Sequence, residues 1–148
     1  MNKMIVIPPP VIALLLIGLA FGLDHLWPGL PRIPLPELGL VLMPTGLTLG
    51  LQALLVFRRQ RTTFVPHGEP TALVIQGPYL WTRNPMYLGL CTALLGLAGY
   101  VGKLPLFLVA PVLFVIIDRI YIPYEEAKLQ RLFGDSYSDL LRTVARWL

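Results

Sequence analysis

Two polar segments of this sequence hold side chains that could bind and orient a charged ligand. The first, residues 76–89, reads QGPYLWTRNPMYLG and combines two tyrosines with an arginine and an asparagine. The second contains Asp118 and Arg119, followed by Glu125 and Glu126. A carboxylate can bind hydroxyl or amino groups, the face of a tyrosine ring can hold a cation, and an arginine can hold an anion. These residue types therefore favour noncovalent recognition of a charged molecule.

The same inventory argues against a metal centre. The chain has one cysteine, Cys91, and only two histidines, His25 and His67. Zinc sites are usually built from three or four such ligands. The single cysteine also excludes an internal disulfide. We therefore expect no metal site.

The elements that must position these polar residues belong in a membrane. Of the 148 residues, 55% are hydrophobic and only 14% are charged, and the mean hydropathy is +0.69. A soluble domain has about 25% charged residues, because its surface faces water. The composition therefore predicts an all-α polytopic membrane protein.

Four apolar stretches are predicted to form one membrane domain that extends over residues 1–148. They cover about residues 5–23, 38–57, 86–101 and 104–120. The first resembles a signal peptide, but its length of about 19 residues and the lack of a small-residue cleavage site indicate a retained span. The last two are predicted to form a hairpin, because one helix over residues 86–117 would be about 48 Å long, against a hydrocarbon core of about 30 Å.

The placement of basic residues predicts the orientation. Ten of the twelve lysines and arginines lie near the N-terminus, in the loop 58–85, or from Arg119 onward, whereas Arg32 and Lys103 lie on the opposite side. Cytoplasmic loops are enriched in lysine and arginine. The cytoplasmic side is therefore predicted to hold both termini, the loop 58–85 and the tail 121–148. The membrane is predicted to be a prokaryotic inner membrane.

The tail is predicted to be an amphipathic helix from Tyr124, with leucines and a phenylalanine along one face. Gly134 is predicted to end this helix, and Asp135 or Ser136 to begin another. By periodicity alone, a helix that lies on the membrane surface remains an alternative.

Each polar segment also has a purely structural interpretation. The first is typical of a turn that leads into a helix. The second could be an interfacial ion pair followed by glutamates at a helix start, where the helix dipole favours acid. The predicted hairpin favours a shared pocket instead, because it returns Arg119 and Glu125 to the membrane face that carries Tyr79 and Asn84.

Taken together, GPYLWTRNPMYLG, DRIYIPYEEAKLQRLFGDSY and VARW resemble the signature of integral-membrane methyltransferases related to isoprenylcysteine carboxyl methyltransferase and the phospholipid N-methyltransferases. The resemblance covers about residues 70–148. It implies methyl transfer from S-adenosylmethionine to a lipophilic acceptor at the cytoplasmic membrane edge. It does not choose among an isoprenylcysteine-like carboxylate, a lipid amine and a small hydrophobic thiol or amine. The implied partners are the bilayer and this acceptor, with no nucleic acid.

The resemblance also implies roles for individual residues. Arg119 and Glu125 would be catalytic, with Arg119 facing the reacting centre. The residues implied to bind S-adenosylmethionine are Leu73, Val74, Tyr79, Asn84, Pro85, Met86, Tyr87 and Glu125. Asn84 departs from the histidine that is common in the carboxyl methyltransferases.

The alternative is a non-catalytic membrane scaffold that kept the fold and lost the chemistry. The presence of Tyr79, Asn84, Tyr87 and Glu125 argues against it. A transporter subunit is disfavoured, because the first two apolar stretches hold no charged relay of the kind that ion pathways need.

Overall fold

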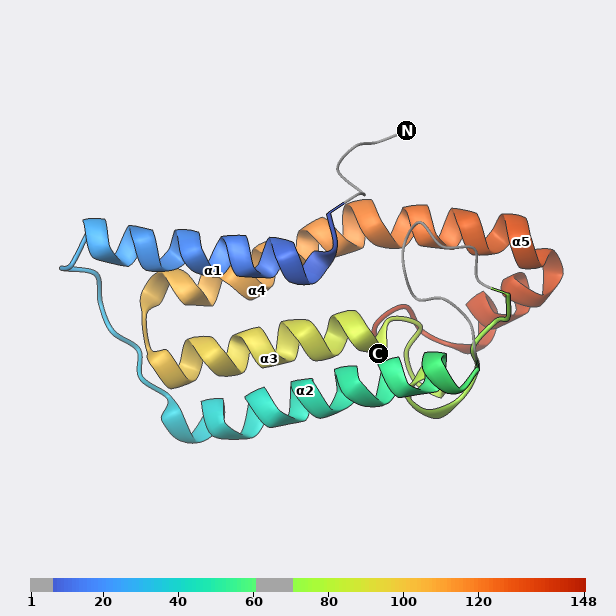
Figure 1. Cartoon of the computed structure of the whole chain (residues 1–148), viewed down its shortest axis with the longest axis horizontal. Coiled ribbons are helices and arrows are strands. Elements are labelled where there is room, and N and C mark those ends of the chain that lie inside the picture. Colours follow the sequence, from blue (N-terminus) through green and yellow to red (C-terminus); the bar gives the residue numbers. More distant parts are fainter. Residues whose placement is uncertain (1–6, 61–70) are drawn as a thin grey trace.

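The structure is a computed structural model that describes residues 7–60 and 71–148, and these residues form helices and no β-strand (Figure 1). The predicted all-α membrane fold is confirmed. The helices are α1 (Pro9–Leu26), α2 (Pro36–Arg59), α3 (Pro85–Val101), α4 (Val109–Ile116) and α5 (Ile122–Thr143). Short helical turns at Gly77–Leu80 and Leu104–Leu108 precede α3 and α4. Lys3, Arg61 and His67 lie outside the described residues.

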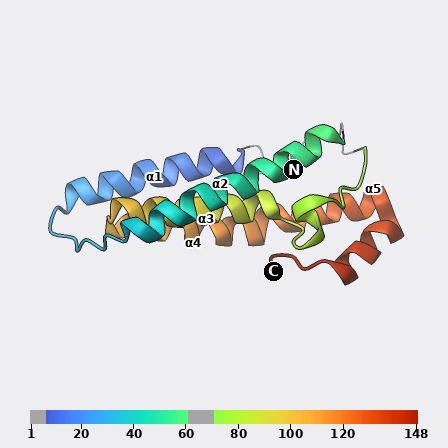
Figure 2. The same cartoon turned by 90° about the horizontal axis from the view of Figure 1, so that it is seen from below.

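The predicted apolar stretches coincide with helices that lie side by side, α1 beside α4 and α2 beside α3 (Figures 1 and 2). Among the described residues, three helices are long and apolar enough to cross a membrane: α1, α2 and the helical segment over Leu104–Thr143. The helix α3 is apolar but shorter, with 17 residues. The chain is therefore an integral membrane protein.

The fourth apolar stretch and the tail differ from the prediction, because no break separates them. The helical segment from Leu104 to Thr143 has 40 residues, whereas about 20 are enough to cross the hydrocarbon core. Its first charged residue is Asp118, so only the apolar part before it suits the bilayer interior. We therefore take α5 to lie outside the membrane-spanning part.

A π-helical turn at Ile117–Tyr121 joins α4 to α5, and its last bond runs from Ile122 N–H to the Ile117 carbonyl. Pro123 follows at the start of α5. Because proline has no N–H to donate, the regular α-helical ladder is interrupted there. The widened turn keeps the two helices continuous across that interruption.

Close backbone packing joins α2 to α3. A Cβ added at Gly46 would lie 2.4 Å from the Ala93 nitrogen and the Gly89 oxygen, and one at Gly96 would lie 2.4 Å from the Met43 nitrogen. Small residues let helix backbones approach within a membrane. These glycines therefore fix the position of α3, which carries part of the polar site.

An ionic cluster closes the end of the bundle that we call the clamp end, at the left of Figure 1. The two carboxylate oxygens of Asp24 lie 2.8 Å from Arg32 Nη1 and 2.6 Å from Lys103 Nζ. The Asp24 side chain is only 5% exposed. The Ile33 N–H also donates to the Gly102 carbonyl at 2.8 Å. The clamp end therefore ties α1, the loop before α2 and the turn before α4 together.

The tail folds back on itself at Gly134, as Figure 2 shows at the red end of the chain. Gly134 has φ 50° and ψ −121° inside α5, a backbone conformation that glycine adopts easily. Beyond this kink, Tyr137, Leu140 and Val144 are buried against Leu73 and the first part of α5. The helix that was predicted to end at Gly134 is kinked there, and the tail packs on the protein.

Candidate functional site

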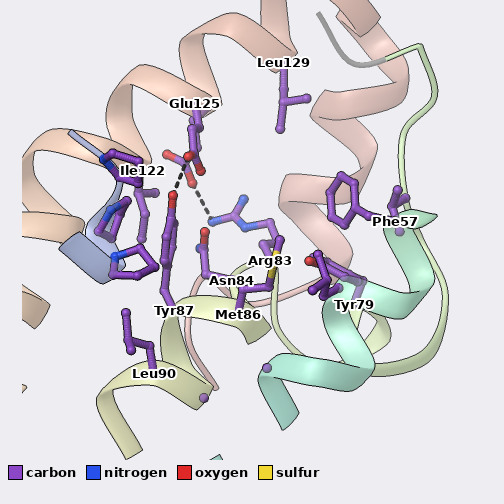
Figure 3. Close-up of a pocket in the computed structure, with 18 of the residues that line it drawn as sticks. Phe57, Tyr79, Arg83, Asn84, Met86, Tyr87, Leu90, Ile122, Glu125 and Leu129 are labelled. Atoms are coloured by element: carbon purple, nitrogen blue, oxygen red, sulfur yellow. Dashed lines mark hydrogen bonds and ion pairs between the residues drawn. The ribbon is translucent and has the colours of Figure 1, made fainter. Parts of the chain in front are cut away.

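A cavity of about 540 Å³ lies at the opposite end of the bundle, which we call the cavity end. It is bounded by the start of α1, the second half of α2, the loop before α3, the start of α3 and α5. Its volume falls in the range of about 300–1,000 Å³ that is usual for small-molecule sites. Figure 3 shows the side chains that point into it.

Residues predicted to bind a cofactor meet at this cavity. Those that line it are Leu73, Val74, Tyr79, Asn84, Met86, Tyr87 and Glu125. Pro85 does not line it and is less than 2% exposed. As the first residue of α3, Pro85 instead sets the start of the helix, where its missing N–H has no consequence.

Arg119 lies outside the cavity, contrary to the expectation that it faces the reacting centre. Its side chain is 81% exposed, and its Nε lies 3.5 Å from Asp118 Oδ2. On a regular helix, residues six apart point about 120° away from each other. Arg119 and Glu125 therefore face different sides, and the ion pair of the structural interpretation is present.

Glu125 is joined to α3 by a short hydrogen bond, in which the Tyr87 hydroxyl donates to Glu125 Oε1 at 2.5 Å (Figure 3). Burial raises the pKa of the Glu125 carboxyl to about 7, against the opposing effects of the Tyr87 hydrogen bond and the charge of Lys128. Nearby Glu126 raises the same pKa further. Carboxyl groups that have a shifted pKa and lie in a cavity are candidates for functional residues. This carboxyl can thus gain a full charge when a cation binds.

Tyr79 forms another wall of the cavity. It is held by the helical turn Gly77–Leu80, whose first residue has φ 58°. The Tyr79 ring packs edge-on against Phe57, with centroids 5.3 Å apart. Burial and the Glu125 charge raise the pKa of the Tyr79 hydroxyl, so it stays neutral. Tyr79 therefore contributes a neutral side chain to the cavity wall.

The C-terminal residues brace the loop before α3, which the sequence did not reveal. The Arg146 carbonyl accepts hydrogen bonds from Asn84 Nδ2 at 2.9 Å and from Thr82 Oγ1 at 3.1 Å. The Arg83 N–H donates to the Ala145 carbonyl at 2.9 Å. Asn84 thus lines the cavity while its amide holds the tail.

An ionic network behind the cavity involves residues that sequence reasoning did not assign. Glu126 lies 3.2 Å from Arg83 Nη2 and 2.7 Å from Arg146 Nη2. Arg146 Nη1 lies 3.5 Å from Asp118, which also accepts a hydrogen bond from Trp147 Nε1 at 2.9 Å. Arg83 and Glu126 line the cavity. Their only sequence signal was their position inside the two polar segments.

Comparison with known proteins identifies the family. Residues 36–136 match the family model for phospholipid methyltransferase. This segment begins at α2 and ends within α5, so it starts earlier than the motif resemblance and leaves out the C-terminal VARW. No curated protein and no solved structure gives a significant match. Because the matched segment covers more than half of the chain, this protein belongs to the phospholipid methyltransferase family.

Proposed function

We propose that the protein transfers a methyl group from S-adenosylmethionine to a lipophilic acceptor, with both molecules in the cavity. The observation that carries the proposal is the cavity itself: in a member of a methyltransferase family, it combines Glu125 and Tyr87 with an apolar side. The transfer belongs to the family, whereas the methyl donor and the acceptor are our proposal.

The residues present fit the methyl donor. When bound, S-adenosylmethionine supplies a methyl group on a positively charged sulfur, and a lone pair of the acceptor displaces the neutral thioether. Glu125 would accept hydrogen bonds from the donor's amino or hydroxyl groups. Tyrosine faces stabilise nearby cations by about 0.5–2 kcal/mol. The protein's contribution is then alignment and exclusion of water, which can supply several kcal/mol.

The apolar side of the cavity supports a lipophilic acceptor. Leu47 and Leu51 of α2 line it, and these residues are 61% and 55% exposed. Pro8, Pro9 and Pro10 face it from the start of α1. An amphiphile could therefore enter from the bilayer between α1 and α2 and bring its polar group toward Glu125. A lipid amine, an isoprenylcysteine-like carboxylate and a small hydrophobic thiol or amine all satisfy this description.

The test uses the full chain in detergent micelles. Calorimetry with S-adenosylmethionine should show saturable binding, and incubation with methyl-labelled donor and a membrane lipid extract should move label into an organic-soluble product. Absence of donor binding by folded protein would support the non-catalytic scaffold. Binding without transfer would leave the donor site standing and contradict the lipophilic acceptor.

A further inference from the structure

One buried cation at the cavity lacks partners for much of its hydrogen-bonding capacity. The side chain of Arg83 is 13% exposed, and its Nη2 pairs with Glu126 at 3.2 Å. Its Nε and Nη1 are buried and meet no acceptor among residues 7–60 and 71–148. A buried donor left unpaired costs about 1–3 kcal/mol, more when it is charged. Native proteins rarely keep such donors without a reason.

The charges around Arg83 also leave it without a carboxylate of its own. Glu126 is already held by Arg146 at 2.7 Å, and Asp118 lies 3.5 Å from both Arg146 and Arg119. In the part of the chain that is described, this network sets three arginines against two carboxylates and keeps one positive charge in excess. Of these arginines, Arg83 is the one that lines the cavity.

The backbone at Arg83 is held in place, whereas among the described residues Glu126 alone pairs with its guanidinium. The Arg83 backbone N–H donates to the Ala145 carbonyl at 2.9 Å, and the next residue, Asn84, is bound to Arg146. Figure 3 shows the guanidinium extending from the loop toward the Glu125 side of the cavity. The cavity thus presents a carboxyl and a guanidinium to the same occupant.

We propose that Arg83 binds the anionic group of a zwitterionic ligand in this cavity, through the guanidinium N–H groups that the protein leaves unpaired. The inference rests on the proposed function, because two ligands of that reaction carry such a group. S-adenosylmethionine has a carboxylate beside its ammonium group, and a phospholipid amine has a phosphate beside its amine. Carboxylate and phosphate oxygens are both strong partners for arginine.

The first arm of the test examines the carboxylate. Calorimetry compares S-adenosylmethionine with its decarboxylated analogue in the wild-type protein, in Arg83→Met and in Arg142→Met. Arg142 is the matched control, because it is 80% exposed and pairs only weakly with Asp139 at 3.9 Å. If Arg83 holds the carboxylate, the wild type and the control should prefer S-adenosylmethionine by about tenfold or more, and Arg83→Met should lose that preference.

The second arm examines the phosphate, with methyl transfer to a phospholipid that bears a primary amine and to a phosphate-free long-chain amine in the same micelles. If Arg83 holds the phosphate, Arg83→Met should raise KM about tenfold for the phospholipid alone. Arg83→Lys retains the charge but not the planar donors, so it should restore little in whichever arm responds.

The results separate the two ideas. If Arg83→Met, or Arg83→Lys should the methionine variant not fold, leaves both preferences intact, Arg83 is only a partner of Glu126 and the inference is wrong. If the wild-type protein binds no S-adenosylmethionine at all, the proposed function fails and this inference fails with it.

Discussion

The two ends of the bundle use buried charges in opposite ways. At the clamp end, each carboxylate oxygen of Asp24 faces a cation, Arg32 or Lys103. At the cavity end, Arg83 keeps N–H groups that no described residue accepts, and the Glu125 carboxyl has a raised pKa. A carboxylate with an ion-pair partner for each oxygen fixes helices, whereas a guanidinium with unpaired N–H groups leaves interactions for a ligand. The difference separates the part of the molecule that holds the fold from the part that can do chemistry.

The largest expected effect concerns the two ends of the bundle, which we expect to lie on opposite sides of the membrane. A reporter fused after Leu148 should lie in the cytoplasm, and a reporter inserted near Pro34 should lie on the external side of the membrane. The reason is the excess of lysine and arginine at the cavity end. Reporter assays in intact cells measure this directly, and the same location for both would contradict the orientation.

Neutralising one carboxylate at each end should separate chemistry from stability. Glu125→Gln should lower methyl transfer about a hundredfold, because alignment of the ligands is steep in distance. Its melting temperature should not fall, because the Glu125 carboxyl is costly to ionise where it is.

Asp24→Asn is the counterpart, and it should lower the melting temperature by several degrees, because Arg32 and Lys103 lose their shared partner. Its methyl transfer per folded molecule should stay normal. Labelled-methyl assays and thermal unfolding measure both variants, and a similar profile for the two would remove the distinction between the ends.

A substitution on α2 tests whether the apolar side of the cavity binds the acceptor. Gly50 lines the cavity, and a Cβ added there meets nothing within 4 Å. Gly50→Leu should therefore fold, fill the apolar side and reduce transfer to a long-chain acceptor about tenfold. The affinity for S-adenosylmethionine should remain within about twofold, since Gly50 lies on α2, whereas the polar residues lie in the loop before α3, on α3 and on α5.

The matched control for this experiment is Gly22→Leu on α1. A Cβ at Gly22 also meets nothing within 4 Å, but Gly22 does not line the cavity. Equal loss of transfer in both variants would show that added bulk on the helices, and not the cavity, is responsible.

The smallest expected effect concerns pH. Because the Glu125 pKa is raised from 4.5 to about 7, the folded protein holds a proton that the unfolded chain releases, so stability without ligand should fall as pH rises through that window. A cationic ligand favours the ionised carboxyl, so its affinity should rise up to about tenfold between pH 6 and pH 8. Calorimetry across this range should show a flatter profile for Glu125→Gln, and identical profiles would exclude Glu125 as the titrating group.

Much of this architecture could be predicted, because its signals are local in the sequence. The apolar stretches gave the helices, and the two polar segments contain most of the polar side chains that line the cavity. Contacts between distant residues could not be predicted, and Asp24 with Lys103 and Asn84 with Arg146 are of this kind. The direction of Arg119 was missed for another reason: the prediction considered only the membrane face to which Arg119 and Glu125 return, although residues six apart on a helix point about 120° away from each other.

The helix that begins at Leu104 continues through the π turn into α5 as far as the kink at Gly134, so it connects the cavity to the membrane-spanning part. A helix that is anchored in lipid tilts when the hydrocarbon thickness changes. Here the helix continues past Asp118 into α5, which carries Glu125. A change in tilt would therefore displace the Glu125 carboxyl relative to Tyr87 on α3. We therefore expect turnover in vesicles to vary with acyl-chain length even for a water-soluble acceptor, which makes membrane thickness itself an input to the reaction rate.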